Sequence, residues 1–412
     1  MGARTSRCRL GVAAVLAAFV WLSVTICPGM ASTVYGPGGL GEPSLEEGAR
    51  IRALGGAGVA EHGATQYSLV NPASTTEIRN LLLQATILPS YRKIDGKNAT
   101  SEGVSETLVP TFRAAVRFPA GIVLGGAYAI GTDAKFRADR PESSGTLSTL
   151  RIDGTGGLQF IRLSLAKSIL RSTRLGVDYE IVAGSYHEEW TRTFADAALS
   201  TMRDTIEVRY DRLGHWRFGG QQSLGRWTLG AVYEMKRELP LTITQKSAGS
   251  TVTTAGRSLT IPDGWAVGLS GSVTSHLHVA TQYRRANWNR ESLPSDLVDF
   301  RPMTRLSFGI ERTGGAGNAG SGASGLPIRL GVSYLEWPDL MPLDRQPTIA
   351  GGTAGVNELT FSLGTGIVTQ DKGGGLDFTI EAGKRGDKEA LGVSERFIRA
   401  ALTLQVADDT WK

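Results

Sequence analysis

The chain has 412 residues, 53 of them glycine, and a formal net charge of +5. Both cysteines, Cys8 and Cys27, lie near the N-terminus in a segment that we expect to be removed, so the mature chain has no disulfide or cysteine metal site. Removing the three arginines of that segment lowers the charge to +2, and no basic run interleaved with aromatics occurs, which argues against nucleic-acid binding.

The N-terminus has the layout of a secretory signal peptide. An apolar run over 10–26 is followed by a helix breaker and then by small residues, and the basic opening before it consists of Arg4, Arg7 and Arg9. We predict a signal over 1–31 with cleavage after Ala31. A retained membrane anchor is the alternative, but the run is short for a spanning helix. No later stretch is long and apolar enough for a transmembrane helix.

Residues 32–79 show poor alternation of apolar and polar side chains. Ser44 and Glu47 have the spacing of a capping box, and a glycine-rich stretch over 54–60 follows. The segment cannot itself span a membrane, and we predict that it folds into the barrel described next as a plug, or hatch. A dinucleotide-binding loop is excluded because Glu61 occupies the position of the third glycine and no strand precedes the loop.

From residue 80 onward, apolar and polar residues alternate with period two, as in strands with one apolar face. The last segment is the clearest, because Ile398, Ala400, Leu402, Leu404 and Val406 share one face and Arg399, Thr403 and Gln405 share the other. We predict fourteen strands, at 80–91, 108–118, 121–137, 156–168, 173–188, 204–223, 226–238, 264–274, 277–288, 304–312, 327–337, 358–369, 375–385 and 395–406.

The gaps between these strands alternate between long and short. The long gaps are 92–107, 138–155, 189–203, 239–263, 289–303 and 338–357. Bacterial outer-membrane barrels have long extracellular loops and short periplasmic turns, and an even strand number places both termini in the periplasm. The sequence therefore predicts an all-β, antiparallel transmembrane β-barrel over 80–412. The Gly/Ala/Ser stretch 313–326 departs from the rule and is interpreted as a flexible connector.

Aromatic residues near the predicted strand ends suggest girdles at the two membrane interfaces, where indole and phenol rings are favoured. Ordinary core positions are the alternative for any one of them. The residues are Trp190, Trp227, Trp265, Trp288, Trp337, Trp411, Tyr186, Tyr283 and Tyr334.

Three groups of residues resemble the long-chain fatty-acid transporter family of outer-membrane proteins, including its aromatic-hydrocarbon branch. The first lies in the plug and comprises Gly55, Gly56, Gly58, Asn71, Pro72 and Ala73. The second runs over 261–268 and 277–283 and on to Trp288. The third comprises 329–332, Asp377, Glu395, Arg396 and Trp411. The chain departs from the family in ending on Lys412 instead of an aromatic residue.

This resemblance implies a fourteen-stranded barrel with an N-terminal hatch that moves hydrophobic ligands such as long-chain fatty acids or aromatic hydrocarbons. The ligand leaves sideways beside a kinked third strand, where Gly125, Gly126 and Gly131 are the candidate kink residues. Relief of crowding in the wall is the alternative role for these glycines. Asn71 is the candidate whose amide fixes the hatch to the wall.

No catalytic pattern stands out, since a Gly-x-Ser-x-Gly elbow is missing, and we expect neither an enzyme nor a cofactor. His276 and His278 lack a nearby third ligand, so a metal site is not expected. Arg192, Lys236 and Arg237 are candidates to meet a ligand carboxylate, with solvated loop charges or contacts to lipid phosphates as the alternatives.

We expect a monomer in the outer membrane whose partners are a hydrophobic ligand, outer-membrane lipids including lipopolysaccharide, and the barrel-assembly machinery. The alternative function is a non-transporting barrel that holds or shuttles secreted proteins. A continuous apolar cavity behind the hatch would favour transport.

Overall fold

The computed structural model describes residues 33, 35, 40–78, 80–97, 102–142, 148–196, 198–247, 249–289, 299–313, 326–342, 353–368 and 374–408. The predicted signal peptide, most of the connector 313–326 and the C-terminal Trp411 lie outside these ranges. Among the described residues, no helix is both long and apolar enough to cross a membrane.

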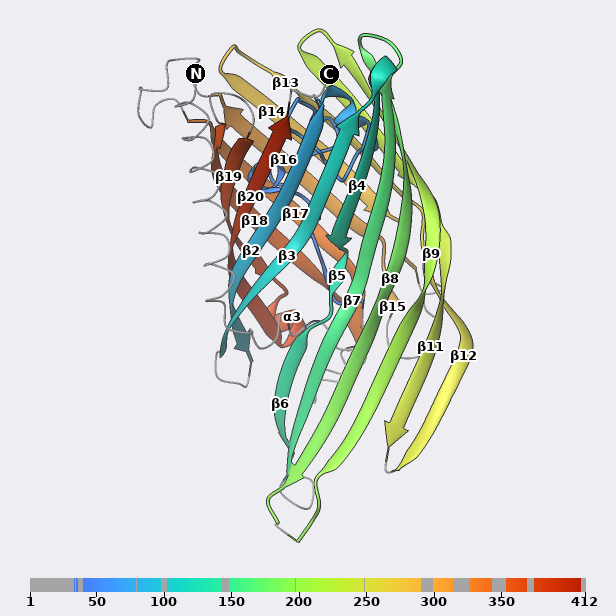
Figure 1. Ribbon diagram of the computed structural model, residues 1–412. Coiled ribbons are helices and arrows are strands. Elements are labelled where there is room, and N and C mark those ends of the chain that lie inside the picture. The colour runs from blue at the N-terminus through green and yellow to red at the C-terminus, as the bar shows by residue number, and fades with distance from the viewer. Residues whose placement is uncertain are drawn as a thin grey trace, which may run out of the picture.

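Fourteen antiparallel wall strands close into a barrel (Figure 1), which confirms the predicted fold class. Ten are continuous: β2 (Leu81–Gly96), β3 (Glu102–Arg117), β7 (Ser148–Ser168), β8 (Thr173–Phe194), β9 (Met202–Leu224), β14 (Leu277–Ala286), β17 (Ile328–Pro342), β18 (Thr353–Val368), β19 (Gly374–Arg385) and β20 (Val393–Asp408). The barrel closes between the first and last strands, where Leu81 pairs with Asp408. β2 therefore begins, and β20 ends, at the short-turn rim.

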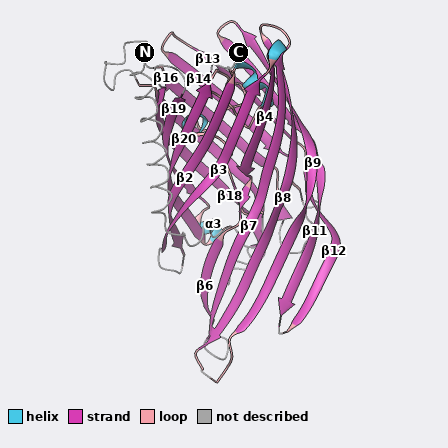
Figure 2. Ribbon diagram, in the orientation of Figure 1, coloured by secondary structure: helices cyan, strands magenta, loops and turns pink. Residues whose placement is uncertain are grey.

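The other four wall strands are interrupted. The third consists of β4 (Ile122–Ile130) and β6 (Phe136–Glu142), and between them β5 (Thr132–Asp133) lies outside the barrel sheet. The seventh consists of β10 (Trp227–Glu234) and β11 (Arg237–Ser247), the eighth of β12 (Ser250–Ile261) and β13 (Gly264–Ser272), and the tenth of β15 (Asp299–Phe300) and β16 (Met303–Arg312). Two short helices, η2 (Pro119–Gly121) and α3 (Lys388–Leu391), connect strands, and Figure 2 shows how little else is helical.

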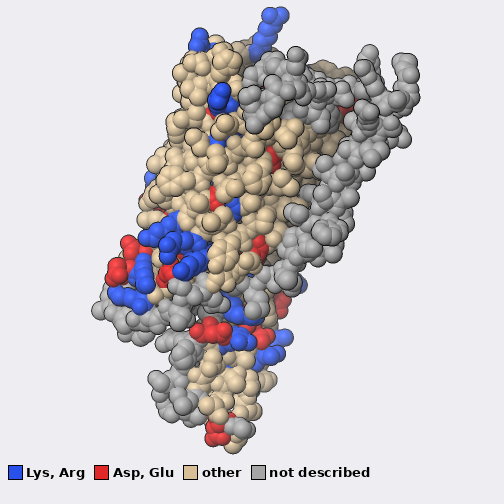
Figure 3. Space-filling view, turned by 90° about the vertical axis from the view of Figure 1, so that its left-hand side faces the viewer, with Lys and Arg blue, Asp and Glu red and all other residues tan. Residues whose placement is uncertain are grey.

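The dyad pattern separates two environments. On β7, Ile161, Leu163 and Leu165 point outward and are each about half exposed, whereas the intervening Arg162 and Ser164 are buried in the lumen. On the face shown in Figure 3, the middle of the barrel is largely uncharged, and most charged side chains lie toward the end that carries the long loops. An apolar exterior around a polar interior is the arrangement of a lipid-embedded barrel.

Several strands are longer than predicted, and the loop predictions 189–203 and 239–263 are largely wrong. β8 and β9 leave only a short connection between them, and 239–263 is mostly the hairpin β11–β12. These strands project beyond the rest of the barrel (Figure 1). Outside the membrane both faces meet water, so the apolar alternation that marks a spanning strand fades while the hydrogen-bonded ladder continues.

The interface position is wrong for three of the predicted girdle aromatics. Trp337, Trp288 and Tyr186 are almost completely buried inside the barrel. Trp337 packs edge-on against Tyr35, and Trp288 packs against Phe300. Nearness to a strand end does not determine which face a side chain occupies, because alternate residues point in opposite directions.

Residues 40–78, here called the internal segment, fold inside the barrel. They form β1 (Glu42–Pro43), α2 (Ala49–Ala53) and η1 (Pro72–Glu77). α2 contacts β17, β18, β19 and β20, whereas η1 contacts β4, β7, β8 and β9, so opposite parts of the wall surround the segment. The predicted capping box is wrong: Gly48 is the N-cap of α2, and the Glu47 carboxylate accepts hydrogen bonds from Ser68 and Val70.

Candidate functional site

Three cross-strand pairs of glycines make room for the internal segment. They are Gly176/Gly219, Gly230/Gly268 and Gly309/Gly331. A Cβ atom at the first pair would collide with Pro72, at the second with Val59 and at the third with Leu54 and Gly55. Because glycine in a strand allows close backbone approach, these pairs let the segment lie directly against the wall.

Polar wall side chains bind the backbone of the segment around the lumen. Gln282 accepts hydrogen bonds from the N–H groups of Gly58 and Val59 at 2.9 and 3.0 Å. Donors from other strands bind the segment's carbonyl oxygens: Gln221 to Val59 and Glu61, Ser270 to Ala60, Ser362 to Ala53 and Thr379 to Ala49. The irregular segment thus satisfies its backbone polar groups through the wall, as buried backbone must.

Asn71 joins the segment to the wall at a fully buried position. Its Nδ2 donates to the carbonyl oxygens of Val59 (2.7 Å) and Gly220 of β9 (3.2 Å), and its Oδ1 accepts from the N–H of Ala73, which caps η1. The predicted amide contact with the wall is therefore present in the structure.

Replacing Asn71 with alanine should loosen this end of the segment. The change removes a helix cap and the hydrogen bonds that the amide donates to two buried carbonyl groups, a loss of about 2–3 kcal/mol. We expect greater leakage of small solutes or lower uptake of a hydrophobic ligand in cells. Asn287, a half-buried residue after β14, provides a control through Asn287→Ala, and unchanged values for both readouts would contradict the assignment.

Buried ion pairs also hold the segment. Glu42 contacts three guanidinium groups, those of Arg92, Arg385 and Arg399, with 2.7 Å between its Oε1 and Nη2 of Arg385. Burial alone would raise the pKa of the Glu42 carboxyl, but these arginines hold it well below its usual range. Farther along, Arg52 pairs with Glu381 at 3.1 Å.

At the short-turn end, two further carboxylates of the segment are paired. Although burial would raise the pKa of Glu61, Arg50 and the hydrogen-bonded His278 lower it to about 2. A hydrogen bond with His62, assisted by Arg174, lowers the pKa of Glu77 to about 2. Both carboxylates therefore stay ionised at neutral pH and keep this end of the segment attached.

The third wall strand breaks where it meets the segment. β4 ends at Ile130, and the next residues pair with the segment, since β5 forms a two-stranded ladder with β1 and the N–H of Ser44 donates to the carbonyl oxygen of Gly131. β6 then resumes the wall and pairs with β7 alone among the described strands. The facing residues 102–108 of β3 have ladder partners only in β2 within the same ranges. The break is crossed by an ion pair between Lys135 and Glu106 (3.6 Å).

An apolar cluster occupies the lumen on the long-loop side of the break. Leu40 of the segment packs there against buried wall residues from several strands: Leu158, Val182, Leu239, Leu241, Leu259, Trp288 and Phe300. Together with the partly buried apolar side chains packed against it, this is the largest apolar cluster among the described residues.

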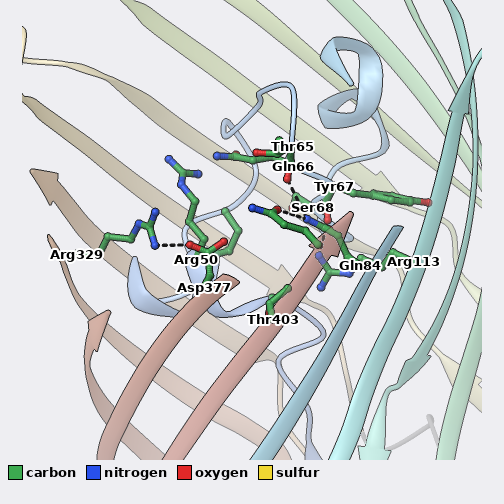
Figure 4. A pocket seen from close by; sticks show the side chains of 13 residues that line it. Arg50, Thr65, Gln66, Tyr67, Ser68, Gln84, Arg113, Arg329, Asp377 and Thr403 are labelled. Carbon is green, nitrogen blue, oxygen red and sulfur yellow. Dashed lines mark hydrogen bonds and ion pairs between the residues drawn. The ribbon is translucent and has the colours of Figure 1, made fainter. Parts of the chain in front are cut away.

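The cavity on the other side of the segment has a mixed lining that includes several charged side chains. It has a volume of about 120 Å³ and lies between the segment and the wall strands β2, β3 and β20 (Figure 4). Arg50, Arg113, Arg329 and Asp377 contribute to its lining. A continuous apolar cavity behind the segment is therefore not seen in the described part of the lumen.

The predicted site residues have several different surroundings. Gly55 and Gly56 adopt positive φ angles of 67° and 87° after α2. Gly131 lies at the strand break, where a Cβ would collide with Phe160, whereas Gly125 makes room for Tyr67 of the segment and a Cβ at Gly126 would be 4.0 Å from the nearest atom.

The candidate arginine, lysine and histidine residues also have different surroundings. Arg237 is buried and pairs with Glu180 at 3.3 Å, which excludes a solvated loop charge, whereas Lys236 is exposed and Arg192 is half-buried. His278 binds Glu61 while His276 lies in an exposed turn, so the two do not converge. No metal-binding group of three or more His, Cys, Asp or Glu occurs in the residues the structure covers.

Sequence reasoning missed the glycine pairs and the luminal ion pairs. Isolated inward glycines in otherwise regular strands were a usable signal for close backbone approach. The pairing of Glu42 with three distant arginines had no local signal, because those residues lie on separate strands.

No protein-family model matches the chain, and no curated protein matches its sequence. Solved structures do match its fold. A Pseudomonas aeruginosa FadL homologue has a TM-score of 0.60 at 13% identity, over 87% of this chain and 98% of that one. The monoaromatic hydrocarbon channel CymD gives 0.54 at 16% identity over 88% and 97%, and the P. putida toluene transporter TodX gives 0.53 at 14% over 89% and 100%. The chain has the barrel fold of these proteins.

Proposed function

We propose that this chain is a FadL-type outer-membrane barrel that transports small hydrophobic molecules. The observation that carries the proposal is the apolar cluster around Leu40, which lies beside the break in the third wall strand. Burial contributes roughly 25 cal/mol per Å² of apolar surface, so such a cluster can retain an oily solute with few polar contacts. The solved structures of the same fold are described as hydrocarbon channels and transporters.

The exit in this proposal is lateral. A route toward the short-turn rim would pass the cavity lined by Arg50, Arg113 and Arg329, where an apolar solute meets charged side chains. The break between β3 and β6 leads instead toward the apolar exterior. In the proposed orientation the short turns and both termini face the periplasm, and residues 40–78 act as the hatch.

Uptake of labelled oleate or toluene by cells with and without the gene tests the function directly. Equal uptake by the two strains would contradict transport and favour the role of a partner for secreted proteins.

A charge placed in the apolar cluster should abolish its use as a binding site. Leu239 and Leu241 of β11 are buried in the cluster with Leu40, so Leu239→Glu should lower uptake at least about tenfold, because it buries an ionised carboxylate among apolar side chains. Val252→Glu, at an exposed position of the adjacent β12, is the matched control. Normal uptake by the Leu239 variant would exclude this cluster from the route.

A further inference from the structure

Three cationic side chains form a row on the outer face of the barrel. Lys384 of β19 lies directly opposite Arg396 of β20, which in turn lies opposite Lys93 of β2. Cross-strand partners share a face, and all three side chains are exposed. Like charges in directly opposed positions destabilise a sheet, so a bound anion would stabilise this row.

The protein supplies only part of the neutralisation. Asp95 lies 2.8 Å from Arg396 and 4.0 Å from Lys93, and nearby Lys97 has its own partner in Glu389 at 3.1 Å. Lys384 has no acidic partner among the residues that the structure describes. Three cations facing one carboxylate leave an excess of two positive charges.

The row borders the apolar exterior. The next outward positions toward the short-turn rim are Ala382, Ile398 and Tyr91, which lie opposite one another in the same three strands. Ile398 and Tyr91 are both more than half exposed. The cations thus lie one step outside the lipid-facing surface, on the long-loop side, where headgroups of the outer leaflet would be found.

An apolar groove begins next to this row. It has a volume of about 370 Å³ and is lined by Pro89, Tyr91, Ile398 and Ala400 among others. The wall is irregular next to this groove, because the pairing of β2 with β3 shifts register between Thr86 and Leu88. The groove therefore extends from the cationic row into the membrane-facing wall.

We propose that the row and the groove together bind a phosphorylated lipid of the outer leaflet, with phosphate on Lys93, Lys384 and Arg396 and an acyl chain in the groove. This inference rests on the proposed outer-membrane placement. It names a lipid site on the outside of the wall, separate from the luminal cluster, whose groove reaches residues 105–107 of β3 beside the strand break.

The test uses the purified mature barrel in neutral lipid nanodiscs, with diphosphoryl lipid A as the probe and native mass spectrometry as the readout. Wild-type protein should bind lipid A saturably. Each cation near an anionic surface contributes roughly a fivefold gain, so Lys384→Gln with Arg396→Gln should weaken binding about 25-fold. Lys167→Gln removes one positive charge from an exposed outward position near the other rim and is the matched control for Lys384→Gln alone. Binding unchanged in the double variant would overturn the proposal.

Two further arms identify the source of the phosphate. Ala400→Trp fills the groove and should weaken lipid A binding while leaving the cations in place. Inorganic phosphate at millimolar concentration should not displace lipid A; displacement, or no effect of Ala400→Trp, would show a simple anion site and overturn the lipid assignment.

Folding is checked by the heat-dependent gel mobility of each variant, and Lys384→Gln alone replaces the double variant if that one fails to fold. A barrel that inserts into bilayers but ignores lipid A contradicts only this inference. A barrel that does not insert contradicts the proposed function as well.

Discussion

Valine in place of both Gly309 and Gly331 should displace residues 53–58 from the wall and open the barrel to small solutes. A Cβ at Gly331 would lie 2.1 Å from the backbone nitrogen of Gly55, and one at Gly309 would lie 2.6 Å from the Cα of Leu54. Neither backbone can yield easily on the wall side, because β16 and β17 are hydrogen-bonded to neighbours on both edges. Overpacking typically costs about 1–3 kcal/mol per site, and here two sites act on one short stretch.

The readout is conductance in planar bilayers together with protease cleavage within residues 40–78. The double variant should conduct and be cleaved, whereas wild-type protein should do neither. Gly220→Val is the control, since the nearest atom to a Cβ there is a leucine methyl at 3.5 Å, an ordinary contact. A double variant that stays closed and protected would show that the glycine pairs do not position the segment.

The strands that cross the membrane could be predicted because lipid and lumen impose opposite demands on alternate residues. On β20 the predicted span 395–406 corresponds to Val393–Asp408. The alternation of apolar and polar residues is lost beyond the membrane, as in β11 and β12. Residues 250–257 of β12 are exposed on both faces of the strand. There the ladder continues without an apolar face to reveal it.

Local pattern also limits what can be predicted of the site. Asn71 and the glycines after α2 were identifiable as local motifs. The break in the third strand was expected, but its cause was not visible, because it depends on β1 pairing with β5 across about 90 residues of sequence. Luminal charges that appeared to be ordinary polar-face residues turn out to be partners of the segment, as Arg385 and Arg399 are for Glu42.

Glu42→Gln should release the N-terminal part of the internal segment from the strand break. The change keeps the size of the side chain but removes the one negative charge that contacts Arg92, Arg385 and Arg399. Breaking a buried ion pair from one side costs roughly 3–5 kcal/mol. The lower end applies here, because Arg385 and Arg399 keep Glu358 as a partner, whereas Arg92 loses its carboxylate. Glu42 also pairs through its backbone with Asp133 of β5. Loss of its ion pairs should therefore weaken the β1–β5 ladder at the break in the third wall strand.

Hydrogen exchange of the barrel in nanodiscs measures this release. The amides of β1 and β5 should exchange at least about a hundredfold faster in the variant, as a loss of roughly 3 kcal/mol requires, while β18 to β20 keep their protection. Glu389→Gln removes a carboxylate from an exposed pair with Lys97 and should change exchange little, since such pairs contribute about 0–1 kcal/mol. If Glu42→Gln left β1 and β5 protected, the backbone ladder alone would hold the segment, and the three arginines would need another role.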